Sequence, residues 1–385
     1  MPRIIAYDIE STTHSKGNPY DARNKMCLAG TYDGTTYDTY DIEYSNTPYR
    51  EQLELLRSNL ESADLIVGFN LKFDANWARK YGIDYSNWKV WDCQICHFIL
   101  TNQTTPYPSL NGVAEHYGLG SKLDKIAEYW DAGIQTYEID YDELREYLEQ
   151  DVSLTLQIYY KQMEELNTTK QHLRKLVQLS NMDILTLADM EFNGLLYNFE
   201  LSKTKAESLT NEIEELDRSL SSFYSIEGLN WNSNDHLSAI LYGGLLKTQG
   251  RETVERTLKD GTVKVSERNC IIEQEMPRLV DPLPRSECAK EGYWKTSEDV
   301  LKSLKAKGKA KEIIQLVLKR SLLDKELNTY ALGLPKLYEE KHYSENLIHG
   351  QFNQVVARTG RLSSSSPNLQ NFSKAAKECI ISRYS

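Results

Sequence analysis

Two acids stand two residues apart near the start of the chain. If the segment 4–11 is a β-strand, as its apolar residues suggest, Asp8 and Glu10 project from one face, and Tyr7 and Ile9 from the other. Two carboxylates about 4 Å apart repel by roughly 1 kcal/mol in water and by about four times that at a partly buried site. A divalent cation between them would relieve this repulsion. The alternative interpretation is an edge strand with two solvated acids.

A third candidate acid, Asp74, follows the apolar run 65–68, which predicts a buried strand. Asn70 is placed to be the N-cap of the next helix, with Asp74 in its first turns. An acid there is favoured by the helix dipole, which is the alternative explanation. The carboxyl end of a strand is also where the sheet would present Asp74 to a metal site.

A fourth candidate, Asp151, lies on a long helix that begins with the predicted capping box of Asp140 and Glu143. Tyr147 precedes Asp151 by four residues, so both side chains share one helix face. They could form a surface hydrogen-bonded pair. Hard oxygen ligands in this number also suit Mg²⁺, with Mn²⁺ as the alternative ion, and two such ions can activate water for hydrolysis of a phosphodiester.

Together these residues resemble a known family. Tyr7-Asp8-Ile9-Glu10, Asn70-x-x-Phe73-Asp74 and Tyr147-x-x-x-Asp151 are similar to the three motifs of DEDD exonucleases of the tyrosine subtype. They occur in the order found in the proofreading domain of family A DNA polymerases. The resemblance implies an α/β fold of the RNase H-like type, with a mixed sheet flanked by helices.

The same resemblance implies roles for the individual side chains. Asp8, Glu10 and Asp151 would hold the catalytic metal, Asp8 would also touch a second ion, and Asp74 would support the site through water. Tyr147 would orient the attacking water, and Asn70 would contact DNA.

A second resemblance lies near the other end of the chain. Residues 359–371, TGRLSSSSPNLQN, are similar to the signature that opens the palm of family A polymerases. Arg361 can donate to minor-groove acceptors shared by all base pairs, and nearby polar side chains can contact primer–template DNA. The predicted contacts are Arg358, Arg361, Asn368, Gln370 and Asn371. A polar, turn-rich loop over 358–371 is the alternative.

These matches predict three regions: an exonuclease domain over 1–165, a mainly helical thumb over 166–343, and an incomplete palm over 344–385. In the second region a leucine- and methionine-rich stripe predicts a helix core; it consists of Leu173, Leu176, Leu179, Met182, Leu185, Leu187 and Met190. An insertion over 245–295 contains a predicted β-hairpin around Asp260-Gly261. Some phage relatives bind a processivity partner at this place, but this insertion has no diagnostic motif.

Charge and composition agree with a cytoplasmic protein that binds nucleic acid. Residues 1–160 carry a net charge of −12 and residues 161–385 a net charge of +1, and within the second part 300–325 hold eight basic and two acidic residues. This basic segment could follow phosphates or form a solvated helix face. We find no long apolar run and no signal peptide, so we expect no membrane contact. Cys93 and Cys96 are expected on a helix turn capped by Asp92, rather than in a metal or redox site.

The sequence ends at Ser385, before the palm aspartates and the fingers that the family uses for nucleotide addition. We therefore predict a 3′–5′ DNA exonuclease acting on single-stranded 3′ ends, with polymerase activity only if a second polypeptide supplies the rest. The short segment before Asp8 suggests a phage origin and thus the host cytoplasm. The alternatives are a catalytically idle DNA-binding subunit of a split polymerase and a stand-alone DEDD-type ribonuclease.

Overall fold

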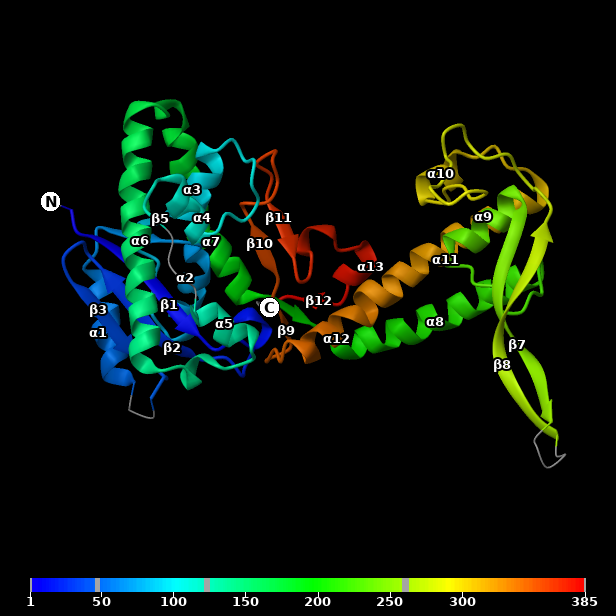
Figure 1. Ribbon diagram of the computed structural model, residues 1–385, viewed down its shortest axis with the longest axis horizontal. Helices are drawn as coiled ribbons and strands as arrows, with labels where there is room; N and C mark the ends of the chain where they lie inside the picture. The colour runs from blue at the N-terminus through cyan, green and yellow to red at the C-terminus, as the bar shows by residue number, and fades with distance from the viewer. Residues whose placement is uncertain (1, 46–48, 121–124, 258–262, 384–385) are drawn as a thin grey trace. The chain divides into compact units, whose positions relative to one another are not determined.

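The computed structural model describes residues 2–45, 49–120, 125–257 and 263–383 (Figure 1). The chain forms two compact units: Met1–Asn198 together with Leu334–Ser385, and Phe199–Gly333. The first unit thus combines both ends of the chain. These units are defined by their internal contacts, whereas the three regions predicted from the sequence are defined by function. The three regions therefore stay a prediction.

The first unit is built on a five-stranded mixed sheet, which confirms the predicted α/β class. Its strands are β1 (Ile4–Ser11), β2 (Met26–Tyr32), β3 (Tyr37–Asp41), β4 (Leu65–Gly68) and β5 (Val90–Asp92). Their order is β3-β2-β1-β4-β5; β3 with β2 and β2 with β1 pair antiparallel, whereas β1 with β4 and β4 with β5 pair parallel. Because β1 lies in the centre, both of its edges are paired.

Helices cover the two faces of this sheet (Figure 1). Tyr7 and Ile9 of β1 pack with α1 (Arg50–Glu61) and α2 (Leu71–Lys80). Ala6 packs with the helices of the opposite face; these are α4 (Leu110–His116) and α6 (Tyr141–Thr168). The alternation predicted for this strand is confirmed. The remaining short elements of this region are η1 (His14–Lys16), α3 (Cys93–Leu100), α5 (Lys125–Asp131) and η2 (Thr136–Glu138).

Helix α7 (Arg174–Asn193), which follows η3 (Gln171–Leu173), contradicts part of the predicted core stripe. Leu176, Leu179, Met182 and Met190 of that stripe are exposed. Leu187 of the stripe is buried, and Leu173 and Leu185 pack against the core, so the prediction is confirmed for these three. The other buried residues of α7 are Val177, Asn181, Ile184, Ala188 and Glu191. The prediction was wrong for the exposed four because it counted apolar residues only, whereas Asn181 and Glu191 are buried with their polar atoms hydrogen-bonded.

The last part of the chain adds small sheets to the first unit. β6 (Leu195–Tyr197) pairs with β9 (Leu347–Ile348) and β12 (Ile380–Ile381), and β10 (Gln351–Asn353) pairs with β11 (Ser363–Ser365). The segment 358–371 is therefore not a loop throughout, because Ser363–Ser365 form a strand against β10. The other elements here are α12 (Gly333–Glu340), η5 (Leu369–Asn371) and α13 (Lys374–Lys377).

The second unit is mainly helical and carries one long β-hairpin. Its helices are α8 (Phe199–Ser221), α9 (Asn234–Tyr242), α10 (Glu298–Ser303), α11 (Gly308–Lys325) and the π-helix η4 (Glu326–Ala331). The hairpin pairs β7 (Gly244–Thr257) with β8 (Val263–Met276). It confirms the predicted hairpin and is longer than expected, while the turn at Asp260-Gly261 lies outside the described residues. Cross-strand pairs such as Lys247 with Glu273 support its register.

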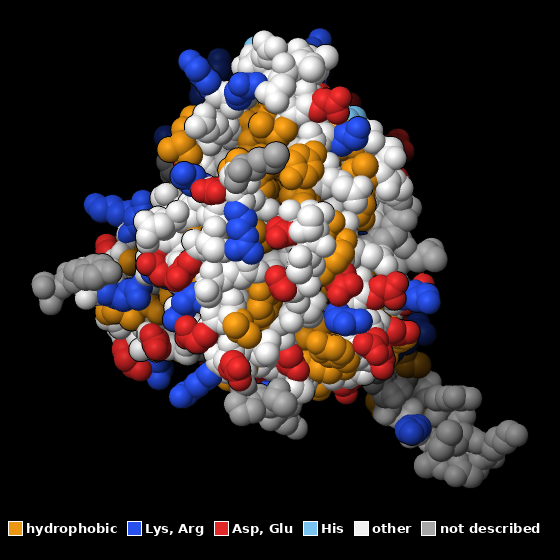
Figure 2. Space-filling view, turned by 90° about the vertical axis from the view of Figure 1, so that its left-hand side faces the viewer, with side chains coloured by type: hydrophobic (Ala, Val, Ile, Leu, Met, Phe, Trp, Pro, Cys, Tyr) orange, Lys and Arg blue, Asp and Glu red, His pale blue; other side chains and the backbone are white. Residues whose placement is uncertain are grey.

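The charged residues of the first unit are dispersed. On the face shown in Figure 2, acidic and basic side chains are interspersed rather than gathered by sign. Among the described residues, no helix combines the length and apolar character needed to cross a membrane.

Two buried histidines should make the first unit sensitive to acid. Burial, together with the nearby His116, lowers the pKa of His97 to about 4, and burial lowers the pKa of His349 to about 4. Because the unfolded chain takes up these protons near pH 6.5, each neutral ring stabilises the fold above that pH, and this contribution is lost as the pH falls toward 4.

We therefore expect His97→Phe to reduce the acid sensitivity of the thermal midpoint between pH 7 and pH 4.5. Over this pH range the wild type should lose on the order of 2 kcal/mol of free energy of unfolding through His97, and the variant should not. His172 is exposed, so His172→Gln is the matched control and should leave the pH profile unchanged. An unaltered pH profile of the His97→Phe variant would contradict this assignment.

Candidate active site

Three acids from two distant segments of the chain, β1 and α6, converge in the first unit. Oxygen atoms of Asp8, Glu10 and Asp151 all lie within 4.8 Å of one another. Glu10 is 5% exposed and Asp151 7%, while Asp8 is half-buried. One cation could therefore contact all three carboxylates.

A glycine in β2 allows α6 to approach the sheet closely enough for this convergence. Asp8 pairs with Gly30 across the β1–β2 ladder, and a side chain at Gly30 would lie 2.7 Å from Leu148 of α6. Asp151 follows Leu148 by just under one turn, so the contact at Gly30 brings its carboxylate to the face of β1 that carries Asp8. The helix begins where predicted, since the Asp140 side chain accepts the N–H groups of Asp142 and Glu143.

Asp74 lies beside this group and is more deeply buried. It is 1% exposed, and burial, reinforced by the charge of Asp8, raises its pKa well above the ordinary value. Its Oδ1 atom is buried and has no hydrogen-bond partner. Asp74 is not among the three acids whose ligand atoms cluster within 4.8 Å. The structure therefore places the predicted fourth acid next to Asp8, behind the group of three.

This donor set fits a divalent metal. Carboxylate oxygens are the ligands that Mg²⁺ and Mn²⁺ prefer, and three of them at this spacing repel one another unless a cation or protons intervene. The unpartnered Oδ1 of Asp74 is a further acceptor that a metal-bound water could satisfy. Asp8, Glu10 and Asp151 would hold the ion.

Tyr147 lies on α6 one turn before Asp151, as predicted. It is half-buried, and its ring packs edge-on against Trp130, with centroids 5.9 Å apart. This packing fixes the ring beside the helix face that carries Asp151.

Asn70 occupies the N-cap position of α2, but its side chain does not cap the helix. It has a left-handed backbone (φ 61°) and makes no side-chain cap hydrogen bond. The capping group comes instead from Asp92, whose Oδ2 accepts the N–H of Leu71 at 2.8 Å. The Asn70 side chain is left exposed.

Asp92 caps two helices at once, and only one of these caps was predicted. Its Oδ1 accepts the N–H groups of Gln94 (2.8 Å) and Ile95 (3.0 Å) at the start of α3, while Oδ2 serves α2. Burial raises the pKa of Asp92, against the effect of these backbone hydrogen bonds. The N–H of Asp92 donates to Asn181 of α7 at 2.5 Å. An acid at a strand end before a helix was the available signal, but the second helix that Asp92 caps begins 21 residues earlier.

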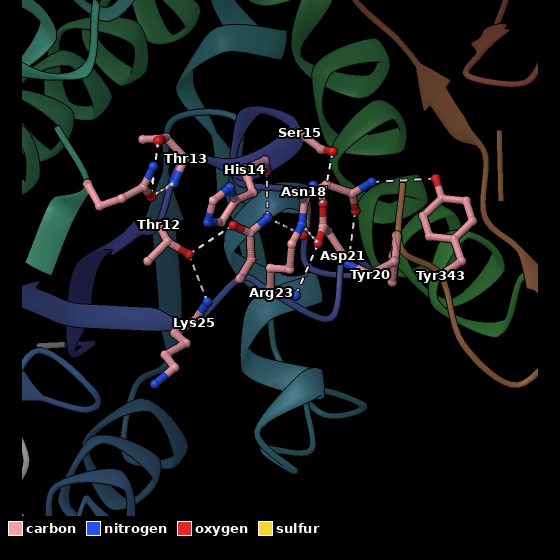
Figure 3. Close-up of polar contacts among 12 residues, drawn as sticks. Thr12, Thr13, His14, Ser15, Asn18, Tyr20, Asp21, Arg23, Lys25 and Tyr343 are labelled. Carbon is pink, nitrogen blue, oxygen red and sulfur yellow. Dashed lines mark hydrogen bonds and ion pairs between the residues drawn. The ribbon is translucent and has the colours of Figure 1, made fainter. Parts of the chain in front are cut away.

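The loop after β1 is held by a polar network, shown in Figure 3. Asp21 is fully buried and accepts hydrogen bonds from Arg23 and Ser15. Burial alone would raise the pKa of Asp21, but these hydrogen bonds outweigh it and lower the pKa to about 2. Asn18 of the same loop donates to the Tyr343 hydroxyl at 3.4 Å. The loop that leaves the acidic site is thus tied to the last part of the chain.

The residues predicted to contact duplex DNA lie elsewhere in the first unit. Arg358 and Arg361 lie between β10 and β11, and the three amide residues lie after β11, in or next to η5. All are exposed: Arg358, Arg361, Asn368, Gln370 and Asn371. The Asn368 side chain accepts the N–H of Gln370 at 3.0 Å, which orders the start of η5.

Comparison with known protein families agrees with this architecture. The family described as 3′-5′ exonuclease matches residues 2–167, and the family described as DNA polymerase family A matches residues 274–383. The first match contains the acidic group and the second contains the exposed residues of 358–371. The chain thus combines a region that matches 3′–5′ exonucleases with a region that matches part of family A DNA polymerases, and residues 168–273 lie in neither match.

Similar proteins are DNA polymerases I of bacteria. The chain is 29% identical over 211 residues to that of Geobacillus stearothermophilus, covering 54% of this chain and 19% of the relative. With the Bacillus subtilis enzyme the identity is 26%, covering 71% of this chain and 26% of the relative. The chain thus spans a minor part of these relatives.

A solved structure confirms the fold. The POL domain of Pol1 from M. smegmatis, in complex with DNA primer-template and dNTP, matches with a TM-score of 0.66 at 17% identity. The match covers 97% of this chain and 53% of that one. At this level of identity the likeness concerns the fold alone.

Removing the double cap should destabilise the first unit strongly. Asp92→Ala leaves N–H groups at the starts of both α2 and α3 without their acceptor, so we expect a loss of about 2–4 kcal/mol in the free energy of unfolding. Asp92→Asn keeps an acceptor oxygen and should lose about half as much. Urea denaturation followed by circular dichroism measures both.

Asp131 provides the control for these variants. It is exposed at the end of α5, so Asp131→Ala should change the free energy of unfolding by less than about 0.5 kcal/mol. Equal urea midpoints for Asp92→Ala and Asp131→Ala would show that the two caps contribute nothing.

Proposed function

We propose that this chain is a metal-dependent 3′–5′ exonuclease that releases nucleoside monophosphates from the 3′ end of DNA, the proofreading activity of a family A polymerase. The observation that supports it most is the convergence of the Asp8, Glu10 and Asp151 carboxylates within 4.8 Å. Two Mg²⁺ ions, or Mn²⁺, would supply an activated water and stabilise the leaving oxygen.

The protein side chains have distinct parts in this proposal. Asp8, Glu10 and Asp151 would hold the cations, and Asp74, buried beside Asp8, would accept a hydrogen bond from a water in the site. The Tyr147 hydroxyl orients the attacking water, as in the tyrosine subtype. Asn70 is exposed at the start of the helix that carries Asp74, and we assign it a contact to the DNA strand.

Contacts to duplex DNA are assigned to the exposed side chains of 358–371. Arg358 and Arg361 donate to the minor groove or the backbone, and three amide side chains complete the contact. These are Asn368, Gln370 and Asn371. The M. smegmatis protein, whose structure holds a primer-template, supports DNA as the partner of this part of the chain.

Several finer points remain predictions from the sequence. They are the phage origin, the cytoplasmic location, the three-region division, a second polypeptide that completes the polymerase, and a processivity partner at 245–295. The relatives described above are bacterial.

The decisive variants are in the acidic group. Incubated with Mg²⁺ and 5′-labelled single-stranded DNA, the wild-type chain should produce a ladder of products shortened from the 3′ end. Asp8→Ala or Asp151→Ala should abolish the ladder, because each removes a metal ligand. Tyr147→Phe should keep weak activity, since a residue that positions the nucleophile contributes a factor on the order of 10²–10⁴ to the rate.

Glu146 supplies a matched control. It is exposed on α6 one residue before Tyr147, so Glu146→Ala should degrade DNA like the wild type. Undiminished digestion by both Asp8→Ala and Asp151→Ala would refute the assignment. A labelled RNA strand in the same assay tests the alternative of a ribonuclease, which would digest it faster than DNA.

Metal binding can be measured without turnover. In the absence of DNA, Mn²⁺ should bind the wild-type chain, as followed by electron paramagnetic resonance, and Asp8→Asn should weaken this binding by at least about tenfold. Equal Mn²⁺ affinity of the two proteins would place the ion elsewhere. This titration also distinguishes an active nuclease from an idle DNA-binding subunit.

A further inference from the structure

Glu191 is a buried acid that the exonuclease mechanism does not use. It lies on the inner face of α7, 3% exposed, and its carboxylate accepts three hydrogen bonds. Oε1 accepts the backbone N–H of Phe352 at 2.6 Å and a bond from Lys72, while Oε2 accepts Asn76 Nδ2 at 2.9 Å. One carboxylate thus connects α7, α2 and β10.

The two contacts on α2 lie directly behind Asp74. Lys72 and Asn76 are four residues apart and therefore neighbours on one helix face. Each is two residues from Asp74, which at 3.6 residues per turn places it roughly 160° around the helix from that acid. A carboxylate that binds both side chains fixes the rotation of α2, and with it the direction in which Asp74 points.

The third contact reaches the part of the chain that matches the polymerase family. β10 is an outer strand of a two-stranded sheet, so one side of its backbone has no strand partner. Lys72 Nζ donates to the Phe352 carbonyl, while Glu191 accepts the Phe352 N–H. Both polar backbone groups of Phe352 are therefore held by the Lys72–Glu191 pair.

A second set of contacts joins the same region to the loop after β1. Nδ1 of His349 lies 2.8 Å from the backbone oxygen of Glu191, and the Tyr343 hydroxyl donates to the His349 backbone oxygen at 3.1 Å. The ring of Tyr20 stacks on His349 with centroids 4.1 Å apart. Asn18, which reaches Tyr343, belongs to the same loop (Figure 3).

The buried Lys72–Glu191 ion pair fixes the orientation of α2 and does not act through stability alone. The Lys72 and Glu191 side chains are 16% and 4% exposed, and desolvation offsets much of the attraction within such a pair. Apolar side chains of similar volume could pack α2 against α7 equally well, but they would not fix its rotation. Removing one partner leaves a buried charge unpaired, which is strongly unfavourable.

We propose that Glu191 is a positioning residue of the exonuclease, acting through Lys72 and Asn76 to hold α2 so that Asp74 faces Asp8. The proposal rests on the exonuclease function proposed above. Through Phe352, the same carboxylate also makes the position of α2 depend on the first strands of the polymerase part.

The test compares Glu191→Gln, Lys72→Met and a control, Asp183→Asn, which is exposed on the same helix α7. We expect both test variants to lower kcat for nucleotide release about 10- to 100-fold with little change in KM for DNA, because an outer-shell partner of a metal site typically contributes this much. They should also weaken Mn²⁺ binding and speed hydrogen exchange in 71–80. Asp183→Asn should match the wild type.

Wild-type kcat and Mn²⁺ affinity in folded Glu191→Gln would overturn the proposal and leave Glu191 a structural residue only. If that variant does not fold, Asn76→Ala, which removes one of the three contacts, must still lower kcat and Mn²⁺ affinity; unchanged values overturn the proposal as well. A wild-type chain that does not degrade DNA refutes the proposed function instead, and Mn²⁺ binding and hydrogen exchange then still test the positioning of α2.

Discussion

Mutual repulsion among carboxylates is the constraint around which the first unit is built. Asp8, Glu10 and Asp151 lie within reach of one ion, and Asp74 is buried beside them. Acids at this spacing are unfavourable for folding unless a cation or protons offset their charge. The fold must therefore hold them in place by other contacts, and those contacts come from residues outside the acidic group.

The holding contacts are of two kinds. Close packing brings α6 to the sheet at Gly30, where any side chain would collide with Leu148. Hydrogen bonds from backbone N–H groups to Asp92 fix the starts of α2 and α3, so one buried carboxylate orients the helix that carries Asp74. Side-chain alternation along β1 sets Asp8 and Glu10 on the same face, and the pairing of Asp8 with Gly30 places that face near α6. Together these contacts place the acids before any ligand binds, which is what preorganised catalysis requires.

Helix α7 relates the two parts that the family comparison distinguishes. It lies just beyond the exonuclease match and well before the polymerase match. Its buried polar residues contact both: Asn181 binds the backbone of Asp92, and Glu191 binds α2 and Phe352. An exonuclease site that shares a carboxylate with the first polymerase strands is not an independent module attached by a linker. It is packed as one compact unit with them.

The sequence by itself determined the elements whose cause is local. Four predicted features that depend on residues close in the chain are present in the structure. They are the alternation around Asp8, the Asp140 cap, the Asp92 cap on α3 and the β7–β8 pairing. The motifs also indicated Asp8, Glu10 and Asp151, which the structure brings together. Sequence did not determine the buried face of α7, where exposed leucines were expected to be inside, because burial of Asn181 and Glu191 depends on partners more than 80 residues away. The second cap of Asp92 and the clamp on Phe352 were likewise decided by tertiary structure, since a polar side chain can be buried only where distant segments supply its hydrogen bonds.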